Sequence, residues 1–113
     1  MATARFIHDG SSIDYTPPSD VAVGDVVVQG ELVGIAKLGI LANALGALAV
    51  TGVFDLPKAT GTGEAIAAGA KVYWDAAEAV AKEDSESGAN KYIGKTLAAT
   101  GDDDATVAVR LSQ

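Results

Sequence analysis

The chain has 113 residues, the length of one domain, because two separate cores would each be too small to be stable. Its 15 acidic and 8 basic residues give a formal net charge of −7, which argues against nucleic acid as a partner, since binding to phosphates requires clustered Lys and Arg. The chain has no cysteine, so disulfides, thiolate metal sites and thiol nucleophiles are excluded. No apolar run approaches the ~20 residues needed to span a bilayer, and the N-terminus lacks a signal-peptide pattern, so we expect a soluble protein without a membrane partner.

Hydrophobic residues make up 49% of the chain, but the aromatic ones are only two Phe, three Tyr and one Trp. The core is therefore expected to consist mainly of Val, Ala, Leu and Ile. A small domain buries a smaller share of its surface than a large one, and the loss of conformational entropy on folding offsets most of the free energy gained by this burial. We therefore expect the protein to form homo-oligomers.

Residues 1–20 are predicted to form an extended N-terminal arm, followed by a single compact domain over residues 21–113. Pro17 and Pro18 lack an N–H and restrict the backbone, so a helix cannot form there. A frayed terminus is the alternative interpretation of this segment. The candidate partner-binding residues of the arm are Phe6, Ile7, Ile13, Tyr15, Pro17 and Pro18.

Short apolar runs between Gly-, Asp- and Ser-containing turns predict strands along the rest of the chain. Residues 76–81 are compatible with a helical turn, and Pro57 is expected to end the strand before it, because it offers no donor to a ladder. Many short strands at regular spacing predict an all-β fold, either a small barrel or a sandwich. The expected strands cover residues 26–28, 31–40, 49–56, 70–74, 91–100 and 105–111.

Residues 41–49 have an ambiguous pattern. The segment is rich in helix formers and has three leucines at helical spacing, Leu41, Leu45 and Leu48. It is short for a stable helix, however, and Asn43 and Gly46 can adopt positive φ angles. We therefore predict a turn, with a single helical turn as the alternative.

The sequence contains no recognisable arrangement of catalytic or metal-binding residues. The only histidine, His8, lies in the arm beside a turn, and nucleophilic catalysis needs a base held against its nucleophile. The run Asp102–Asp104 lacks the alternation of a calcium loop, and Gly61-Thr-Gly63 lacks the Lys-Ser/Thr ending of a phosphate loop. We therefore expect no enzymatic activity, no metal and no cofactor.

Tyr73 and Trp74 are neighbours on a predicted strand, so their side chains should point to opposite faces. Trp74 is expected to fill a core that has few other large side chains. The alternative is that Trp74 anchors a partner, since Trp is enriched at interface hot spots.

Four motifs follow one another along the chain: Ile13-Asp-Tyr-Thr, Gly24-Asp-Val-Val, Val53-Phe-Asp-Leu-Pro-Lys and Val72-Tyr-Trp-Asp. In this order and spacing, the sequence resembles the phage capsid cement, or decoration, proteins along nearly its whole length. The resemblance implies a compact β-rich domain on the outer surface of a tailed-phage head. It also implies oligomers, often trimers, an N-terminal segment that reaches onto the major capsid protein, and no catalytic residues.

The resemblance implies a structural virion protein that stabilises the expanded shell by bridging major capsid proteins. Its expected partners are the major capsid protein and further copies of itself, with a trimer as the expected oligomer. A contiguous exposed apolar surface usually marks an interaction site, so an oligomer or capsid contact is expected at Leu41, Leu45, Leu48 and Trp74. The alternative function is a small β-barrel ligand-binding or adhesion module, and an enzyme of unknown type is a more remote possibility.

Overall fold

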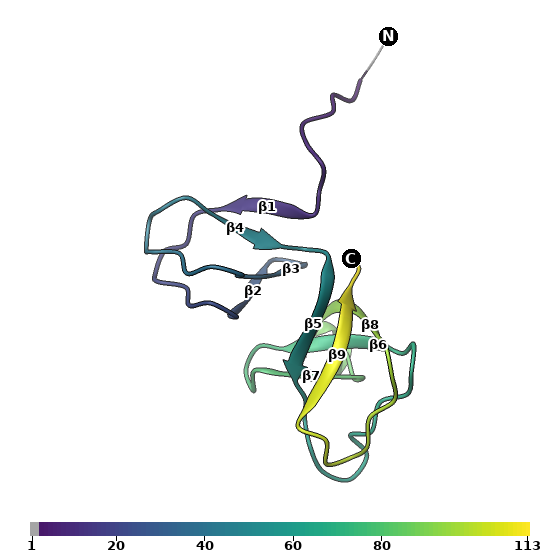
Figure 1. Cartoon of the computed structure of the whole chain (residues 1–113). Coiled ribbons are helices and arrows are strands. Elements are labelled where there is room, and N and C mark those ends of the chain that lie inside the picture. Colours follow the sequence, from purple (N-terminus) through teal and green to yellow (C-terminus); the bar gives the residue numbers. More distant parts are fainter. Residues whose placement is uncertain (1–2) are drawn as a thin grey trace.

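The computed structural model describes residues 3–113, which form nine strands in two antiparallel sheets (Figure 1). The four-stranded sheet has the order β1-β4-β3-β2. Its strands are β1 (Ser12–Tyr15), β2 (Val26–Gln29), β3 (Leu32–Ile35) and β4 (Gly46–Ala49). The prediction of an all-β fold is confirmed.

The five-stranded sheet has the order β5-β9-β8-β6-β7. Its strands are β5 (Gly52–Pro57), β6 (Lys71–Asp75), β7 (Val80–Lys82), β8 (Lys91–Thr96) and β9 (Thr106–Leu111). One turn of 3-10 helix, η1 (Glu86–Gly88), lies between β7 and β8. The sheet curls until its edge strands approach each other, and Lys58 forms a parallel bridge with Ala81 there. The fold is nevertheless a sandwich of two sheets and not a closed barrel.

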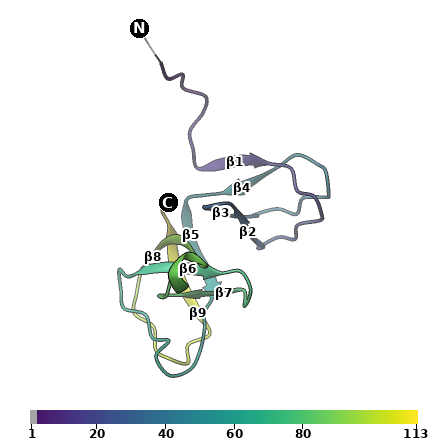
Figure 2. The same cartoon turned by 180° about the vertical axis from the view of Figure 1, so that it is seen from behind.

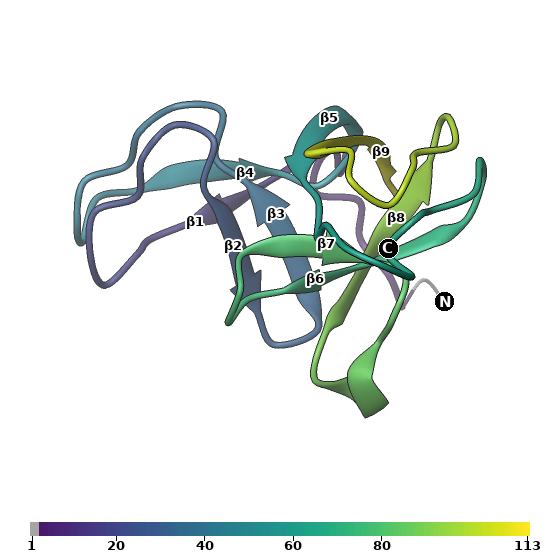
Figure 3. The same cartoon turned by 90° about the horizontal axis from the view of Figure 1, so that it is seen from below.

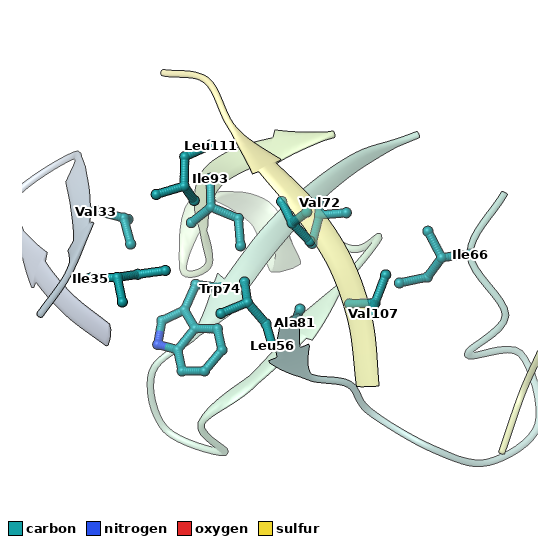
Figure 4. Packing of buried hydrophobic residues seen from close by; sticks show 11 residues of the cluster. Val33, Ile35, Leu56, Ile66, Val72, Trp74, Ala81, Ile93, Val107 and Leu111 are labelled. Carbon is teal, nitrogen blue, oxygen red and sulfur yellow. The ribbon is translucent and has the colours of Figure 1, made fainter. Parts of the chain in front are cut away.

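The four-stranded sheet lies beside the five-stranded sheet (Figure 3). The main core lies between the two sheets and along the inner face of the five-stranded sheet. Val33 and Ile35 of β3 face the larger sheet, and Figure 4 shows Ile35 beside the ring of Trp74. Alternation along the strand expected over residues 105–111 predicts that Val107, Val109 and Leu111 share one face. The structure confirms this, because all three side chains of β9 lie in the main core. The larger sheet and its loops contribute Leu56, Ile66, Val72, Trp74, Ala81, Ile93, Val107, Val109 and Leu111.

A second, smaller cluster covers the opposite face of the four-stranded sheet. Alternation along β2 sends Val26 and Val28 into the main core and Val27 into the second cluster. The second cluster consists of Ala36, Ile40 and Leu48, with Ile13, Tyr15, Val21 and Val27 packed against it. Both faces of the small sheet are therefore partly covered by the chain's own side chains.

The predicted strand over residues 49–56 is wrong, because the chain changes sheet within it. β4 ends at Ala49, and β5 begins at Gly52, in the other sheet. Gly52 has a φ of 114°, a conformation that only glycine adopts without strain, and this allows the sharp change of direction. The run of apolar residues is continuous across this corner, so the sequence pattern did not reveal it.

Other predicted boundaries also differ from the structure. The strands expected over residues 31–40 and 91–100 end earlier, at Ile35 and Thr96. The predicted turn is found only in the first half of residues 41–49, where Asn43 has the expected positive φ of 64°. Residues 46–49 instead form β4, because they pair with β1.

The predicted arm of residues 1–20 is divided into two parts, and its residues 1 and 2 lie outside the described residues. Residues 3–9 are extended and exposed, and Figures 1 and 2 show this first part projecting away from both sheets. Gly10 and Ser11 form a turn, and the Ser11 carbonyl oxygen accepts a 3.0 Å hydrogen bond from the Val50 N–H. Residues 12–15 form β1, which pairs with β4 from Ser12↔Ala49 to Tyr15↔Gly46. The second part is therefore a strand of the small sheet, and only the first part is free of the body.

Candidate interaction surface

The free part of the arm presents apolar side chains that contact little else in the chain. Phe6 is 80% exposed and Ile7 is 75% exposed. They are adjacent in an extended segment, so their side chains point in opposite directions. A partner could therefore cover both sides of this segment.

The other residues predicted to bind a partner through the arm differ in how far the body of the protein buries them. Ile13 and Tyr15 are half-buried against the second cluster, because β1 turns them toward Leu48 and its neighbours. Pro17 is fully buried, and its carbonyl oxygen accepts a 2.8 Å hydrogen bond from the Asn43 N–H. Pro18 is exposed. Phe6, Ile7 and Pro18 are thus available to a partner, whereas Ile13, Tyr15 and Pro17 hold the base of the arm to the body.

The four residues expected at an oligomer or capsid contact also differ in their exposure to solvent. Leu41 and Leu45 are each 71% exposed on the turn before β4. Leu48 is only 1% exposed, because alternation along β4 points it into the second cluster. Trp74 is 5% exposed and lies in the main core. The expectation of a contact role for Leu48 and Trp74 is corrected, and Leu41 and Leu45 remain candidates.

A groove lies beside these leucines on the small sheet. We call it the β4 groove; it has a volume of about 490 Å³, and Ser11 and Ser12 at the base of the arm line it together with Leu45. Leu38, which is 77% exposed, lines it from the segment that follows β3. The β4 groove, the exposed leucines and the free arm are therefore neighbours on one side of the molecule.

Leu38 is a candidate contact residue that the sequence reasoning missed. A strand predicted to continue to residue 40 offered no reason to single it out from its neighbours. The structure ends β3 at Ile35, so Leu38 lies in an irregular segment, outside the sheet. The cluster Lys37-Leu38-Gly39 contained a glycine, a weak signal that the strand ends before it.

The main charged cluster of the molecule has a structural role. Lys82 Nζ lies 2.8 Å from Glu78 Oε1, 3.1 Å from Asp75 Oδ2 and 3.2 Å from Glu86 Oε2. Hydrogen bonds to Glu78 and Asp75 raise the pKa of Lys82. Hydrogen bonds from the Glu78 N–H and from Lys82 lower the pKa of Asp75. Both groups therefore stay charged near neutral pH and hold the turn between β6 and β7.

The described residues contain no arrangement suited to catalysis or metal binding. Within residues 3–113, no three His, Cys, Asp or Glu side chains are placed to hold a metal ion. His8 lies on the exposed arm, with Nδ1 2.6 Å from the carbonyl oxygen of its neighbour Asp9. No helix in this part of the chain is long and apolar enough to cross a membrane. The free arm and the exposed apolar side chains are the candidate surfaces for a partner in this part of the chain.

Comparison with known proteins gave one match. The sequence profile of the phage cement protein family matches residues 7–111. The matched region begins in the free arm and ends with β9, so it includes both sheets. No curated protein and no solved structure matches the chain.

Proposed function

The chain belongs to the phage cement protein family, and on this basis we propose that it binds the outer surface of a tailed-phage head and bridges major capsid proteins. The observation that carries the proposal is the family match over nearly the whole chain. The family indicates a structural role in the capsid, and the exposed apolar arm supplies the means of attachment.

We propose that the protein stabilises the expanded capsid shell by binding to it. A protein that binds the expanded shell better than its precursor shifts the equilibrium toward the expanded state. Each copy can act weakly, because many copies on one shell combine their effects. No catalytic step is needed for this function.

The arm is suited to binding an extended partner. Residues 3–9 are extended and exposed, so their backbone can add a strand to an edge of the capsid protein. Phe6 and Ile7 would then pack on the two faces of that strand. β1 would transmit the attachment to the small sheet through its pairing with β4.

Other copies of the chain are the second proposed partner, with a trimer as the proposed oligomer. Leu38, Leu41 and Leu45 are each more than 70% exposed, and exposed apolar side chains gathered in one region can mark an interaction site. In a closed symmetric oligomer each copy would bury the same patch. We place this oligomer or capsid contact at the β4 groove and its leucines.

The arm is tested by deleting residues 2–9, which keeps the turn at Gly10 and Ser11 and leaves β1 in the small sheet. The truncated protein should melt as the full chain does, because the deleted residues that the structure describes are exposed. Its affinity for expanded, undecorated heads should fall by roughly tenfold to a hundredfold, since burying one Phe or Ile side chain contributes about 1.5–3 kcal/mol. Binding is measured by co-sedimentation with the heads.

A double replacement, Phe6→Ser with Ile7→Ser, should reproduce most of this loss in a chain of normal length. His8→Ser serves as the matched control on the same segment and should bind normally. If the truncated protein decorates heads as tightly as the full chain, the arm is not the attachment. A ligand-binding or adhesion module should not bind the heads stoichiometrically at all.

Leu38→Asp and Leu45→Asp test the proposed contact at the β4 groove, because both side chains line it. Both variants should fold normally, since Leu38 is 77% exposed and Leu45 is 71% exposed. Decoration by each variant should weaken by roughly tenfold or more, since a charge would be buried in an apolar contact. Val23→Asp is the control, because Val23 is 67% exposed and does not line the groove. Normal decoration by both leucine variants would remove this contact from the proposal.

A further inference from the structure

Three basic side chains lie side by side across the outer face of the five-stranded sheet. Lys71 of β6 pairs with Lys95 of β8, and Lys95 pairs with Arg110 of β9. All three residues are exposed. At about 4.8 Å between neighbouring strands, the outer two backbones are about 10 Å apart. We call Lys71, Lys95 and Arg110 the basic row.

The basic row is unfavourable for the isolated chain. Like charges directly opposite each other on paired strands destabilise a sheet. Within residues 3–113, none of the three forms an ion pair, although the chain has 15 acidic residues. In contrast, Lys82 contacts three carboxylates, and Lys91 pairs with Glu31. Such an uncompensated row points to a partner that supplies carboxylates.

Apolar side chains flank the basic row. Val53 of β5 is the register partner of Arg110 and is 56% exposed. Leu97 follows β8 and is 53% exposed, and its N–H bonds to the carbonyl oxygen of Ala108 in β9. Exposed ion pairs alone contribute only ~0–1 kcal/mol each. The flanking apolar surface would add the burial that a specific contact requires.

The same chain carries a matching group of carboxylates in the turn before β9, residues 101–104, which we call the acidic turn. Asp102 and Asp104 are held by backbone hydrogen bonds, because they accept from the N–H groups of Ala65 and Gly101 at 2.9 Å and 2.8 Å. Asp103 is exposed and accepts no hydrogen bond. The turn is thus a preformed acidic projection, visible in Figure 1 at the start of β9.

The acidic turn cannot reach the basic row of its own chain. It precedes β9, whereas Arg110 is near the end of that strand. Arg110 lies six positions after Asp104, which corresponds to about 20 Å along a strand. Only a second copy can therefore bring the two groups together.

We propose that the basic row binds the acidic turn of a second copy of this chain in a head-to-tail contact. Such a contact uses two different surfaces, so it forms a closed ring when the rotation between copies closes. The inference rests on the proposed self-association, to which it adds a second contact besides the one proposed at the β4 groove, but it does not rest on binding to the capsid. A long polyanion such as DNA fits less well, because the chain's net charge of −7 repels it and three cations neutralise few phosphates.

The contact is tested on the full-length protein without capsids. Isotope-labelled and unlabelled protein are mixed at millimolar concentration, treated with a carbodiimide that joins amines to carboxylates, and analysed by mass spectrometry. The expected products join Lys71 or Lys95 of one copy to Asp103 or Asp104 of another, across the two labels. If these residues are never joined between copies, the proposal is wrong.

Reversing one charge on each side of the proposed contact compares each single variant with a mixture of the two. Lys95→Glu and Asp103→Lys should each lower the yield of cross-linked dimer by roughly threefold or more, because each places like charges together. A 1:1 mixture of the two variants should restore the yield through contact between the two reversed charges. Arg5→Glu and Asp9→Lys, on the free arm, make the same changes in net charge and should leave the yield unchanged.

Two results would overturn the proposal even if the single variants lose yield. One is a mixture of variants that does not recover. The other is tight binding of a DNA duplex by the unchanged chain that Lys95→Glu abolishes, because the basic row would then be a site for nucleic acid. Failure of the protein to decorate heads would refute the capsid proposal alone, since no capsid enters this experiment.

Discussion

Replacing Trp74 with alanine is expected to lower the free energy of unfolding by about 3–5 kcal/mol. The ring is 5% exposed and lies in the main core, where Figure 4 shows it beside Ile35 of the other sheet. The rest of that core is mostly aliphatic and cannot fill the space that the ring would leave. For a domain of this size, the melting temperature should fall by roughly 10–25 °C, measured by circular dichroism.

Two variants make the Trp74 result specific. Trp74→Phe keeps an aromatic ring and should lose clearly less stability than Trp74→Ala. Tyr73→Phe changes the neighbouring residue, whose ring packs edge-on against Tyr92 with centroids 5.8 Å apart, and should have little effect. An unchanged melting temperature for Trp74→Ala, combined with lost decoration, would instead place the ring at an interface.

Gly94→Ala is expected to destabilise the protein by about 3 kcal/mol or more, the upper end of the range for overpacked sites. A Cβ atom at this position would lie 2.0 Å from the carbonyl oxygen of Arg110 and 3.1 Å from the Cα of Leu111. Both contacts are with backbone, so no side-chain rotation can relieve them. β8 and β9 would have to separate in the middle of the five-stranded sheet, where Gly94 pairs with Leu111.

Gly10→Ala is the matched control, because a Cβ atom there meets nothing within 4 Å. Its unfolding curve in urea should superimpose on that of the unchanged chain. The curve of Gly94→Ala should shift to much lower urea, or the variant should fail to fold. If Gly94→Ala and Gly10→Ala unfold at the same urea concentration, β8 and β9 separate easily and the expected destabilisation is wrong.

The sequence by itself determined the fold class and most of the strands. Short runs of β-branched or aromatic residues between turn residues located β2, β6 and β9, and alternation assigned Val107, Val109 and Leu111 to one face. These features depend on near neighbours in the chain, which is why they can be predicted. The order of short motifs along the chain also led to the family that the profile match shows.

Only the tertiary structure decided which exposed residues are available to partners. Leu45 and Leu48 look equivalent in the sequence, but pairing of β4 with β1 buries Leu48 and leaves Leu45 exposed. The change of sheet at Gly52 likewise depends on which strands the two halves pair with. The basic row was invisible because Lys71, Lys95 and Arg110 are far apart in the sequence. Local patterns specify the strands, but pairings between distant residues set which side chains face each other and which face solvent.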